Sequence, residues 1–355
     1  MIIAGEASGD MYGARLARSI KSESPQTFIF GVGGQAMQTE GVRCIVDAET
    51  LSVVGITEVI SKLPTVFRAM SIVKKALHSL KPDLLILIDF PEFNFRVAAA
   101  AKKLNIPVLY YISPQIWAWR QNRVNKIKRL VDHMAVILPF EAAFYRDYQV
   151  PVTFVGHPLL DKIPIETTNA VQETNQQQPV IGLLPGSRDK EVANLLPVML
   201  ESARMIKRKL PTAKFLVSCS ESINASWVAD LVRPYASTLD IEVVEGTVSQ
   251  VFKRSLLLVA ASGTVTLEAA LHGVPMVIVY RVSPLSYWMG KRLIKVKHIG
   301  IVNLIVQKEL LPELIQDDAS PPIIAEKVIQ MISDREGLKQ IEAELLAIRD
   351  LLGGA

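Results

Sequence analysis

The chain has 355 residues, half of them hydrophobic, and its 39 basic and 35 acidic side chains leave a net charge of +4. This length is more than one hydrophobic core usually supports, so we expect two domains. Two cysteines far apart in sequence exclude a disulfide framework, and no motif beside the basic residues indicates a nucleic acid partner. The sequence has neither a signal-peptide pattern nor an apolar run long enough for a spanning helix, which favours a cytoplasmic or peripheral membrane protein.

The first part of the chain alternates short apolar runs with helical patterns. Strands are predicted at Met1–Ala4, Thr27–Phe30, Asp83–Ile88, Pro107–Ile112, His133–Leu138 and Val152–Val155. Helices are predicted over 11–20, across 51–80 and from Pro139. This alternation indicates a doubly wound parallel sheet, and we place this first α/β domain at residues 1–158. Its glycine-rich turns fit neither G-x-G-x-x-G nor a Walker A motif, which argues against a dehydrogenase or a P-loop enzyme.

The helical stretch 51–80 has a mixed character that allows two interpretations. Its apolar side chains are interspersed with bases such as Arg68 and Lys74. The apolar residues can pack into a core, or they can form a basic-rimmed patch that enters a membrane interface. The residues that would make up this membrane patch are Val53, Val54, Ile56, Leu63, Val66 and Phe67.

A polar segment at residues 159–179 has the composition of a linker. After it, strands are predicted at Val180–Leu184, Phe215–Cys219, Ile241–Val244, Leu256–Ala260 and Met276–Tyr280, again alternating with helices. Residues 180–333 are therefore predicted to form a second doubly wound α/β domain. The helical pattern of 334–355 would cap or cross the domains. Two such domains in tandem are expected to hold their ligand in the cleft between them.

Asp89 is the first carboxylate that the pattern singles out. It follows the buried strand Asp83–Ile88, at the end where open α/β sheets bind ligands. Partial burial there would raise its pKa toward that of a useful general base. An aspartate at a strand end also often caps the following turn, and position alone does not distinguish the two roles.

Two strand-to-helix turns in the second half consist of small and polar residues: Gly186, Ser187 and Arg188, and Ser262, Gly263 and Thr264. The free N–H groups and the dipole of each following helix favour an anion. Arg188 would complete a diphosphate clamp, although a surface ion pair with Glu191 is an alternative. Glu268 lies one helical turn after Thr264, on the same face. Because neither a D-x-D pair nor a metal-binding histidine spacing occurs, no metal and no cofactor are expected.

Six motifs occur in order: AGEASGD (4–10), LIDFPEFN (87–94), SPQIWAWR (113–120), VGHPL (155–159), LLPGSRDKE (183–191) and ASGTVTLE (261–268). With them the chain closely resembles the lipid-A-disaccharide synthases, a family of GT-B type glycosyltransferases. The resemblance implies two Rossmann-like domains that face a cleft, the first binding the acceptor and the second the donor. The implied reaction is an inverting transfer of 2,3-diacylglucosamine from UDP-2,3-diacylglucosamine to 2,3-diacylglucosamine 1-phosphate, which yields a β-1,6-linked disaccharide 1-phosphate and UDP.

The resemblance also implies roles for single residues. Asp89 would deprotonate the acceptor 6-hydroxyl, Glu268 would bind the ribose, and Asn303 would lie on the nucleotide side. Val302 stands where the family usually has a proline. The other implied donor-binding residues are Gly186, Ser187, Arg188, Ser262, Gly263 and Thr264. The implied acceptor side comprises Gly5, Glu6, Ser8, Gly9, Asp10, Asn94, Arg120 and Arg123. The membrane patch and the basic clusters would hold the acylated substrates at the anionic cytoplasmic face of the inner membrane.

Two other kinds of function remain open. Another GT-B enzyme that acts on a UDP-sugar, such as a lipid-linked sugar transferase or an epimerase, would share the fold and the phosphate turns. A non-catalytic nucleotide-binding membrane module would share the turns and the basic clusters but would not need Asp89. The sequence does not indicate an oligomeric state.

Overall fold

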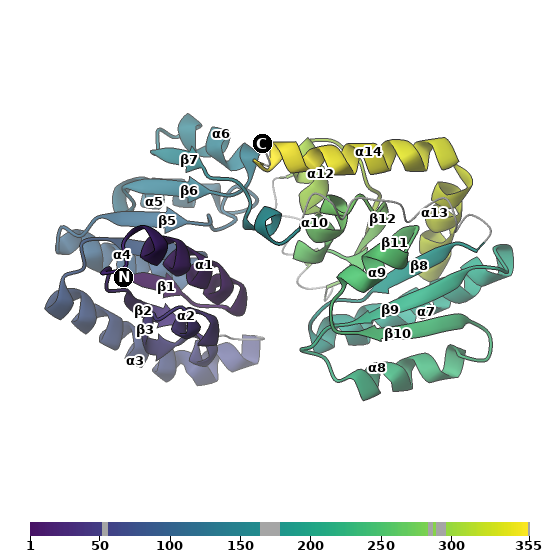
Figure 1. Ribbon diagram of the computed structural model, residues 1–355, viewed down its shortest axis with the longest axis horizontal. Helices are drawn as coiled ribbons and strands as arrows, with labels where there is room; N and C mark the ends of the chain where they lie inside the picture. The colour runs from purple at the N-terminus through teal and green to yellow at the C-terminus, as the bar shows by residue number, and fades with distance from the viewer. Residues whose placement is uncertain (52–55, 164–177, 283–286, 289–295, 354–355) are drawn as a thin grey trace. The chain divides into compact units, whose positions relative to one another are not determined.

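A computed structural model describes residues 1–51, 56–163, 178–282, 287–288 and 296–353 of the chain. The chain divides into two compact units, Met1–Pro158 and Leu159–Ala355 (Figure 1). The described residues form one parallel sheet in each unit, with seven strands in the first and six in the second. The prediction of two doubly wound α/β domains is therefore confirmed. The expected cleft between the domains stays a prediction.

The sheet of the first unit has the strand order β3-β2-β1-β4-β5-β6-β7. Its strands are β1 (Ile2–Ala4), β2 (Phe30–Gly33), β3 (Arg43–Asp47), β4 (Leu85–Ile88), β5 (Val108–Tyr111), β6 (His133–Val136) and β7 (Val152–Phe154). The strand order changes direction between β1 and β4, and the carboxyl ends of these two strands form the position where such sheets bind ligands.

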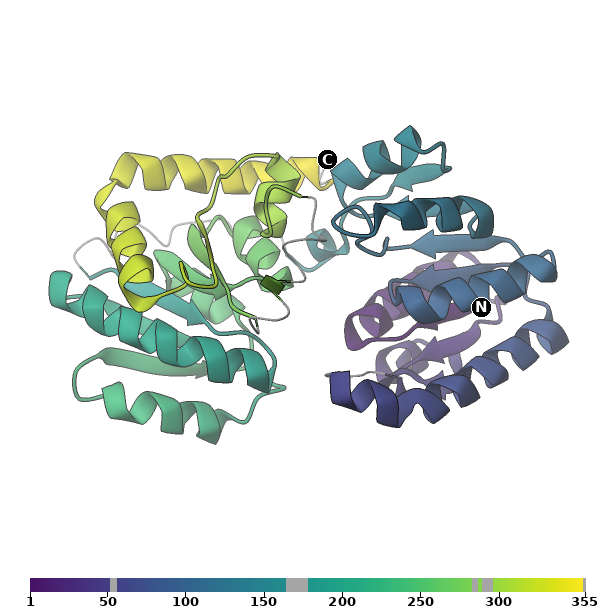
Figure 2. The same cartoon turned by 180° about the vertical axis from the view of Figure 1, so that it is seen from behind.

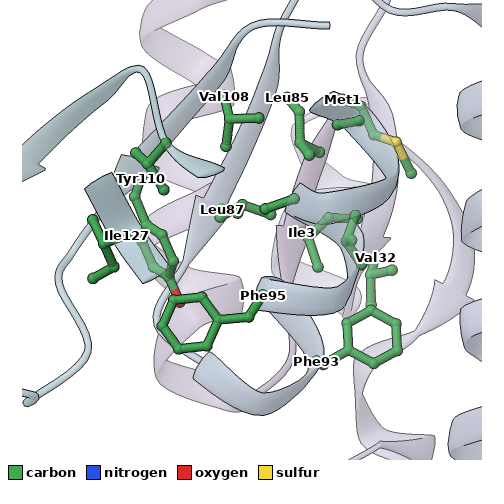
Figure 3. Packing of buried hydrophobic residues seen from close by; sticks show 14 of the residues in the cluster. Met1, Ile3, Val32, Leu85, Leu87, Phe93, Phe95, Val108, Tyr110 and Ile127 are labelled. Atoms are coloured by element: carbon green, nitrogen blue, oxygen red, sulfur yellow. The ribbon is translucent and has the colours of Figure 1, made fainter. Parts of the chain in front are cut away.

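Helices cover both faces of this sheet. They are α1 (Ala7–Glu23), α2 (Gln35–Thr39), α3 (Ile56–Leu80), α4 (Pro91–Lys103), α5 (Val124–Leu130) and α6 (Pro139–Asp147). Helices α1 and α2 lie in front of the sheet in Figure 1, and α3 to α5 lie in front of it in the opposite view of Figure 2. Figure 3 shows Phe95 of α4 near Leu87 of β4, and Phe93 of the same helix next to Val32 of β2, in the core. This packing fixes the start of α4, just after Asp89.

Two expectations about the first sheet were wrong. Strand β3 was not predicted, because it is a half-exposed edge strand whose apolar signal is weak. Strand β2 begins at Phe30 and continues into the glycines, whereas the apolar run 27–30 predicted that it ends at Phe30. Gly31 allows the strand to continue beyond Phe30, because its backbone lies close to β1. A Cβ at this position would lie 1.7 Å from the Ile2 carbonyl oxygen. Only glycine allows β2 to pair with β1 at this point.

The sheet of the second unit has the order β10-β9-β8-β11-β12-β13. Its strands are β8 (Val180–Leu184), β9 (Lys214–Cys219), β10 (Asp240–Glu245), β11 (Leu257–Ala261), β12 (Met276–Tyr280) and the unpredicted edge strand β13 (Glu313–Ile315). Its helices are α7 (Asp189–Lys209), α8 (Ala225–Val232), α9 (Ser249–Arg254), α10 (Thr264–Leu271), α12 (Ile301–Val306), α13 (Pro321–Ser333) and α14 (Arg335–Leu351). The direction changes between β8 and β11, which lead into α7 and α10.

The C-terminal helices pack on their own unit. Asp334 separates α13 from α14, and its Oδ1 accepts a hydrogen bond from Gly337 N at 2.9 Å. Helix α14 contacts α10, α12 and α13. Arg349 donates to the Ile163 carbonyl oxygen at 2.9 Å and so holds the start of the predicted linker, of which 164–177 lie outside the described residues. Across the described helices, none has the length and apolarity needed to cross a membrane.

Candidate active site

Asp89 lies at the carboxyl end of β4 in a backbone conformation that is rare for residues other than glycine. Its φ is 42°, and that of Phe90 is 48°. Two consecutive left-handed residues cost free energy, so the surrounding structure must hold them. The Tyr110 hydroxyl donates to the Asp89 carbonyl oxygen at 2.5 Å, and Asn94 Nδ2 donates to the same oxygen at 2.6 Å. Strain held by buried polar groups is typical of a functional position.

The environment of Asp89 changes its acidity. Burial, followed by the negative charge of Glu6, raises the pKa of Asp89 from 3.8 to about 6. A carboxylate with this pKa is ionised at pH 7 and is also basic enough to accept a proton from a bound hydroxyl. The geometry and the electrostatics therefore fit a general base, and the hydrogen bond of this carboxylate with the Phe90 backbone also fits the alternative role of a turn cap.

The Asn94 side chain supports the backbone of Asp89 from the interior of the first unit. Its side chain is fully buried, and its Nδ2 also donates to the Ile88 carbonyl oxygen at 3.2 Å. Its Oδ1 has no hydrogen-bond partner among the residues that the structure describes. This side chain holds the end of β4, and its implied position on the acceptor side stays a prediction.

The glycine-rich N-terminal turn touches the Asp89 turn. A Cβ on Gly5 would lie 2.2 Å from the Phe90 ring, so glycine is required for this contact. Gly9 faces β1, where its Cβ would lie 3.4 Å from the Ala4 Cβ. Glu6 and Ser8 are exposed beside this turn. Of the predicted acceptor-side residues in this turn, these two have exposed side chains.

Asp10 was implied on the acceptor side, and the structure gives it a different role. Its carboxylate is buried and accepts hydrogen bonds from the backbone N–H groups of Gly34 at 2.6 Å, Ala36 at 2.9 Å and Met37 at 3.1 Å. These groups lie at the start of α2, where they would otherwise have no partner. Asp10 therefore caps α2 from a distant part of the sequence.

Arg120 and Arg123 share one carboxylate of α4. Arg120 Nη1 lies 3.3 Å from Glu92 Oε1, and Arg123 donates to the same oxygen. The Arg120 guanidinium also lies over the Trp119 ring, 4.3 Å from its centroid. Glu92 is three residues after Asp89, so both guanidinium groups are held at the start of α4, and such a pair of arginines has the geometry to bind a phosphate.

Glu141 belongs to this part of the sheet, although the sequence does not single it out. Its Oε1 accepts from Trp117 Nε1 at 2.9 Å and its Oε2 from Leu138 N at 3.1 Å. Burial raises the pKa of Glu141 to about 7, and Asp89 adds to the rise. Its position at the start of α6, directly after β6, is the signal that could have identified it. Glu141 therefore holds Trp117, in the loop after β5, at the same edge of the sheet as Asp89.

The two phosphate turns of the second unit line one cavity of about 380 Å³. Gly186 has φ +116°, which requires glycine, and nothing lies within 4 Å of a Cβ on Gly263. The backbone at the start of α10 is thus open to a close anion, whereas at the start of α7 the Glu191 carboxylate lies 2.5 Å from the position of a Cβ on Gly186. Sequence patterns miss the other walls, which come from the ends of β9 and β10. The lining residues are Leu184, Gly186, Ser187, Arg188, Glu191, Ser218, Cys219, Ser220, Gly246, Val248, Ala261, Ser262, Gly263, Thr264 and Val265.

Arg188 is paired with Glu191 at 2.9 Å, and 67% of its side-chain surface is exposed. The ion pair that the sequence offered as an alternative to a diphosphate clamp is thus present. It does not remove Arg188 from the cavity, which both residues line. In the described part of the chain, no group of three His, Cys, Asp or Glu side chains could hold a metal ion.

Glu268 lines a second cavity of about 470 Å³, together with Lys162, Ile163, Thr247, Val248, Ser249, Lys253 and His272. Burial raises the pKa of Glu268, and Lys162 opposes the rise. Thr264 lines the first cavity and Glu268 the second, so the prediction that Thr264 contacts the phosphates and Glu268 the ribose of one ligand stays a prediction. Val248 lines both cavities, and a ligand that reaches both residues must extend past it.

Asn303 is fully buried and forms hydrogen bonds only to its own loop. Its Nδ2 donates to the Leu311 carbonyl oxygen and to Glu313 Oε1, each at 2.7 Å, and its Oδ1 accepts from Leu310 N and Leu311 N at 3.0 and 2.9 Å. This side chain holds the connection from α12 to β13, and its implied position on the nucleotide side stays a prediction. Val302 is the second residue of α12, where proline would also fit.

The predicted membrane patch is only partly described. Val53 and Val54 lie outside the described residues, and Ile56 begins α3. Leu63 and Phe67 are 42% and 60% exposed, and at a spacing of four they share one face of α3. Val66 packs instead against the core. The core interpretation therefore applies to the face of α3 that carries Val66, while the membrane patch on the exposed face stays a prediction.

Comparisons with known proteins agree with this geometry. A family model described as lipid-A-disaccharide synthetase matches residues 1–352. The chain is 44% identical to the lipid-A-disaccharide synthase of Trichlorobacter lovleyi, with 100% of this chain and 93% of the relative covered. It is 45% identical to the protein of that name from Geobacter sulfurreducens, with 99% and 92% covered.

Solved structures share the fold at low sequence identity. The UDP-GlcNAc 2-epimerase of Neisseria meningitidis bound to UDP-GlcNAc matches with a TM-score of 0.62 and 13% identity, covering 100% of this chain and 99% of that one. The glycosyltransferase of kitacinnamycin matches with a TM-score of 0.61 and 14% identity, covering 99% and 97%. Both are similar in having two α/β domains.

Proposed function

Since the chain belongs to the lipid-A-disaccharide synthase family, we propose that it is an inverting glycosyltransferase of lipid A synthesis. The donor is UDP-2,3-diacylglucosamine and the acceptor is 2,3-diacylglucosamine 1-phosphate. The products are the β-1,6-linked disaccharide 1-phosphate and UDP.

The observation that carries this proposal is the strained, partly buried Asp89 at the carboxyl end of β4. Its carboxylate accepts the proton of the acceptor 6-hydroxyl while that oxygen attacks the anomeric carbon of the donor. The new bond is the glycosidic C–O bond, and the bond that breaks joins the anomeric carbon to the diphosphate. A base with a pKa near 6 suits this proton transfer at neutral pH.

The first cavity of the second unit supports the departure of UDP. Its two helix starts and Arg188 place N–H groups and a positive charge where a diphosphate gains negative charge. The adjoining cavity that Glu268 lines suits the ribose and the uracil of UDP, because a carboxylate accepts hydrogen bonds from ribose hydroxyls. These protein groups would neutralise the leaving group without a metal.

Arg120 and Arg123 are the groups we propose for the acceptor 1-phosphate, since guanidinium pairs bind phosphate with good geometry. Exposed Leu63 and Phe67, with Arg68 beside them, suit the headgroup region of an anionic membrane. The acyl chains of both substrates give the enzyme a reason to work there. We therefore place it at the cytoplasmic face of the inner membrane.

The test supplies both substrates with EDTA present and looks for disaccharide 1-phosphate and UDP by mass spectrometry. We expect product with the natural chain and none with Asp89→Asn, which should still bind UDP. Absence of product, or product only with added metal, contradicts the mechanism. Incubation with UDP-GlcNAc alone tests the epimerase alternative, which would yield a changed sugar without an acceptor.

A further inference from the structure

The phosphate turn of α7 contains a carboxylate that belongs to the chain itself. Glu191 lies in the first turn of α7, and its Oε1 accepts from Arg188 Nη1 at 2.9 Å. Its Oε2 accepts from Ser187 N at 3.2 Å. A Cβ on Gly186 would lie 2.5 Å from the same Oε2. The carboxylate therefore lies within the turn and holds two of the groups that would bind a donor phosphate.

A phosphate oxygen and a carboxylate oxygen seek the same donors, namely backbone N–H groups at a helix start and a guanidinium. A diphosphate can take the Ser187 amide and Arg188 only if Glu191 releases them. The side chains of Arg188 and Glu191 are 67% and 36% exposed, so their pair adds little stability. Such a pair is readily exchanged.

We propose that Glu191 is an internal competitor for the donor diphosphate, an inference that rests on the proposed function. It keeps Arg188 and the Ser187 amide ordered, and it yields them to a ligand with greater negative charge. Weak anions are thereby disfavoured, and the site selects for a diphosphate. The opposite role, in which Glu191 positions Arg188 for the bound donor, predicts the opposite sign for the variant described below.

The same arrangement recurs in the first unit. Glu92 lies in the first turn of α4 and holds both Arg120 and Arg123, the groups proposed for the acceptor phosphate. In both units, a glutamate of the first helical turn thus pairs with the arginines assigned to a substrate phosphate. This recurrence supports an exchange of carboxylate for phosphate.

The test measures the binding of UDP and of uridine to the full chain by titration calorimetry. Glu191→Gln keeps an oxygen for the Ser187 amide but removes the charge. The matched control is Glu201→Gln, which removes an Arg–Glu pair of the same i,i+3 spacing on α7, away from the cavity. We expect Glu191→Gln to bind UDP about two- to five-fold more tightly than the natural chain. Uridine binding and the control should not change.

The inference is overturned if Glu191→Gln binds UDP as tightly as the natural chain or more weakly. Unchanged uridine binding by this variant would demonstrate that its site is folded. If the natural chain binds UDP and the variant shows no gain, only the internal competitor is refuted. If the natural chain binds neither UDP nor uridine, the proposed donor site fails as well. The two failures are thus distinguishable.

Discussion

Asp89→Asn should stabilise the protein while it abolishes transfer. Burial and Glu6 raise the pKa of Asp89 in the folded chain, so the ionised carboxylate that the proposed reaction needs destabilises the fold. Asparagine has nearly the same shape and carries no charge. It also tolerates the left-handed φ of 42° better than most residues do. Activity and stability are therefore in conflict at this position.

The size of the effect follows from the pKa values. The pKa rises from 3.8 to about 6, and one pKa unit corresponds to about 1.4 kcal/mol, so ionised Asp89 costs about 3 kcal/mol above pH 7. The sign is set by the raised value: the folded state binds the proton more tightly, so the cost grows as pH rises from about 4 to 6. Below pH 3.8 both states are protonated and the cost is absent.

Thermal unfolding from pH 4 to 8 measures this difference. The melting temperature of Asp89→Asn should exceed that of the natural chain by several degrees at pH 8, and the gap should shrink toward pH 4. Asp83→Asn removes an exposed carboxyl before the other end of β4 and should change stability by less than about 0.5 kcal/mol. Equal or lower stability of Asp89→Asn at pH 8 would refute the argument that this carboxylate is held ionised against its surroundings.

Three further outcomes are expected. The kcat/KM of transfer should fall about tenfold per pH unit below a limb near pH 6, where Asp89 becomes protonated; a limb near pH 4 would exclude this carboxyl as the base. Val302→Pro should leave the melting temperature nearly unchanged, because the N–H of the second residue of α12 has no partner within the helix. Leu304→Pro removes the hydrogen bond from Leu304 N to the Gly300 carbonyl oxygen and should lower the free energy of unfolding by about 3 kcal/mol or more. Phe67→Glu should weaken binding to anionic vesicles without a change in melting temperature, while Val66→Glu should unfold the first unit; unfolding by Phe67→Glu would mean that this side chain serves the core.

Three of the predicted site residues have a structural role that the sequence did not predict. Asp10, Asn94 and Asn303 lie in motifs or loops of the site, and a polar side chain there suggests a ligand. In the structure, each hydrogen-bonds to backbone groups that a strand end or a helix start leaves without partners. Which backbone groups lack partners depends on how the chain folds, and sequence patterns do not contain that information.

The sequence by itself determined the alternation of buried strands and helices, the turns at Gly186 and Gly263, and the position of Asp89 at a strand end. Local apolar periodicity and glycine are sufficient for these features. Only the tertiary structure decided the edge strands β3 and β13, whose half-exposed residues give weak apolar signals, and the separation of Glu268 from Thr264 into adjoining cavities. It also decided that Asp10 caps α2 and that Glu92 pairs with Arg120 and Arg123, because those contacts join residues from separate elements whose proximity arises only on folding.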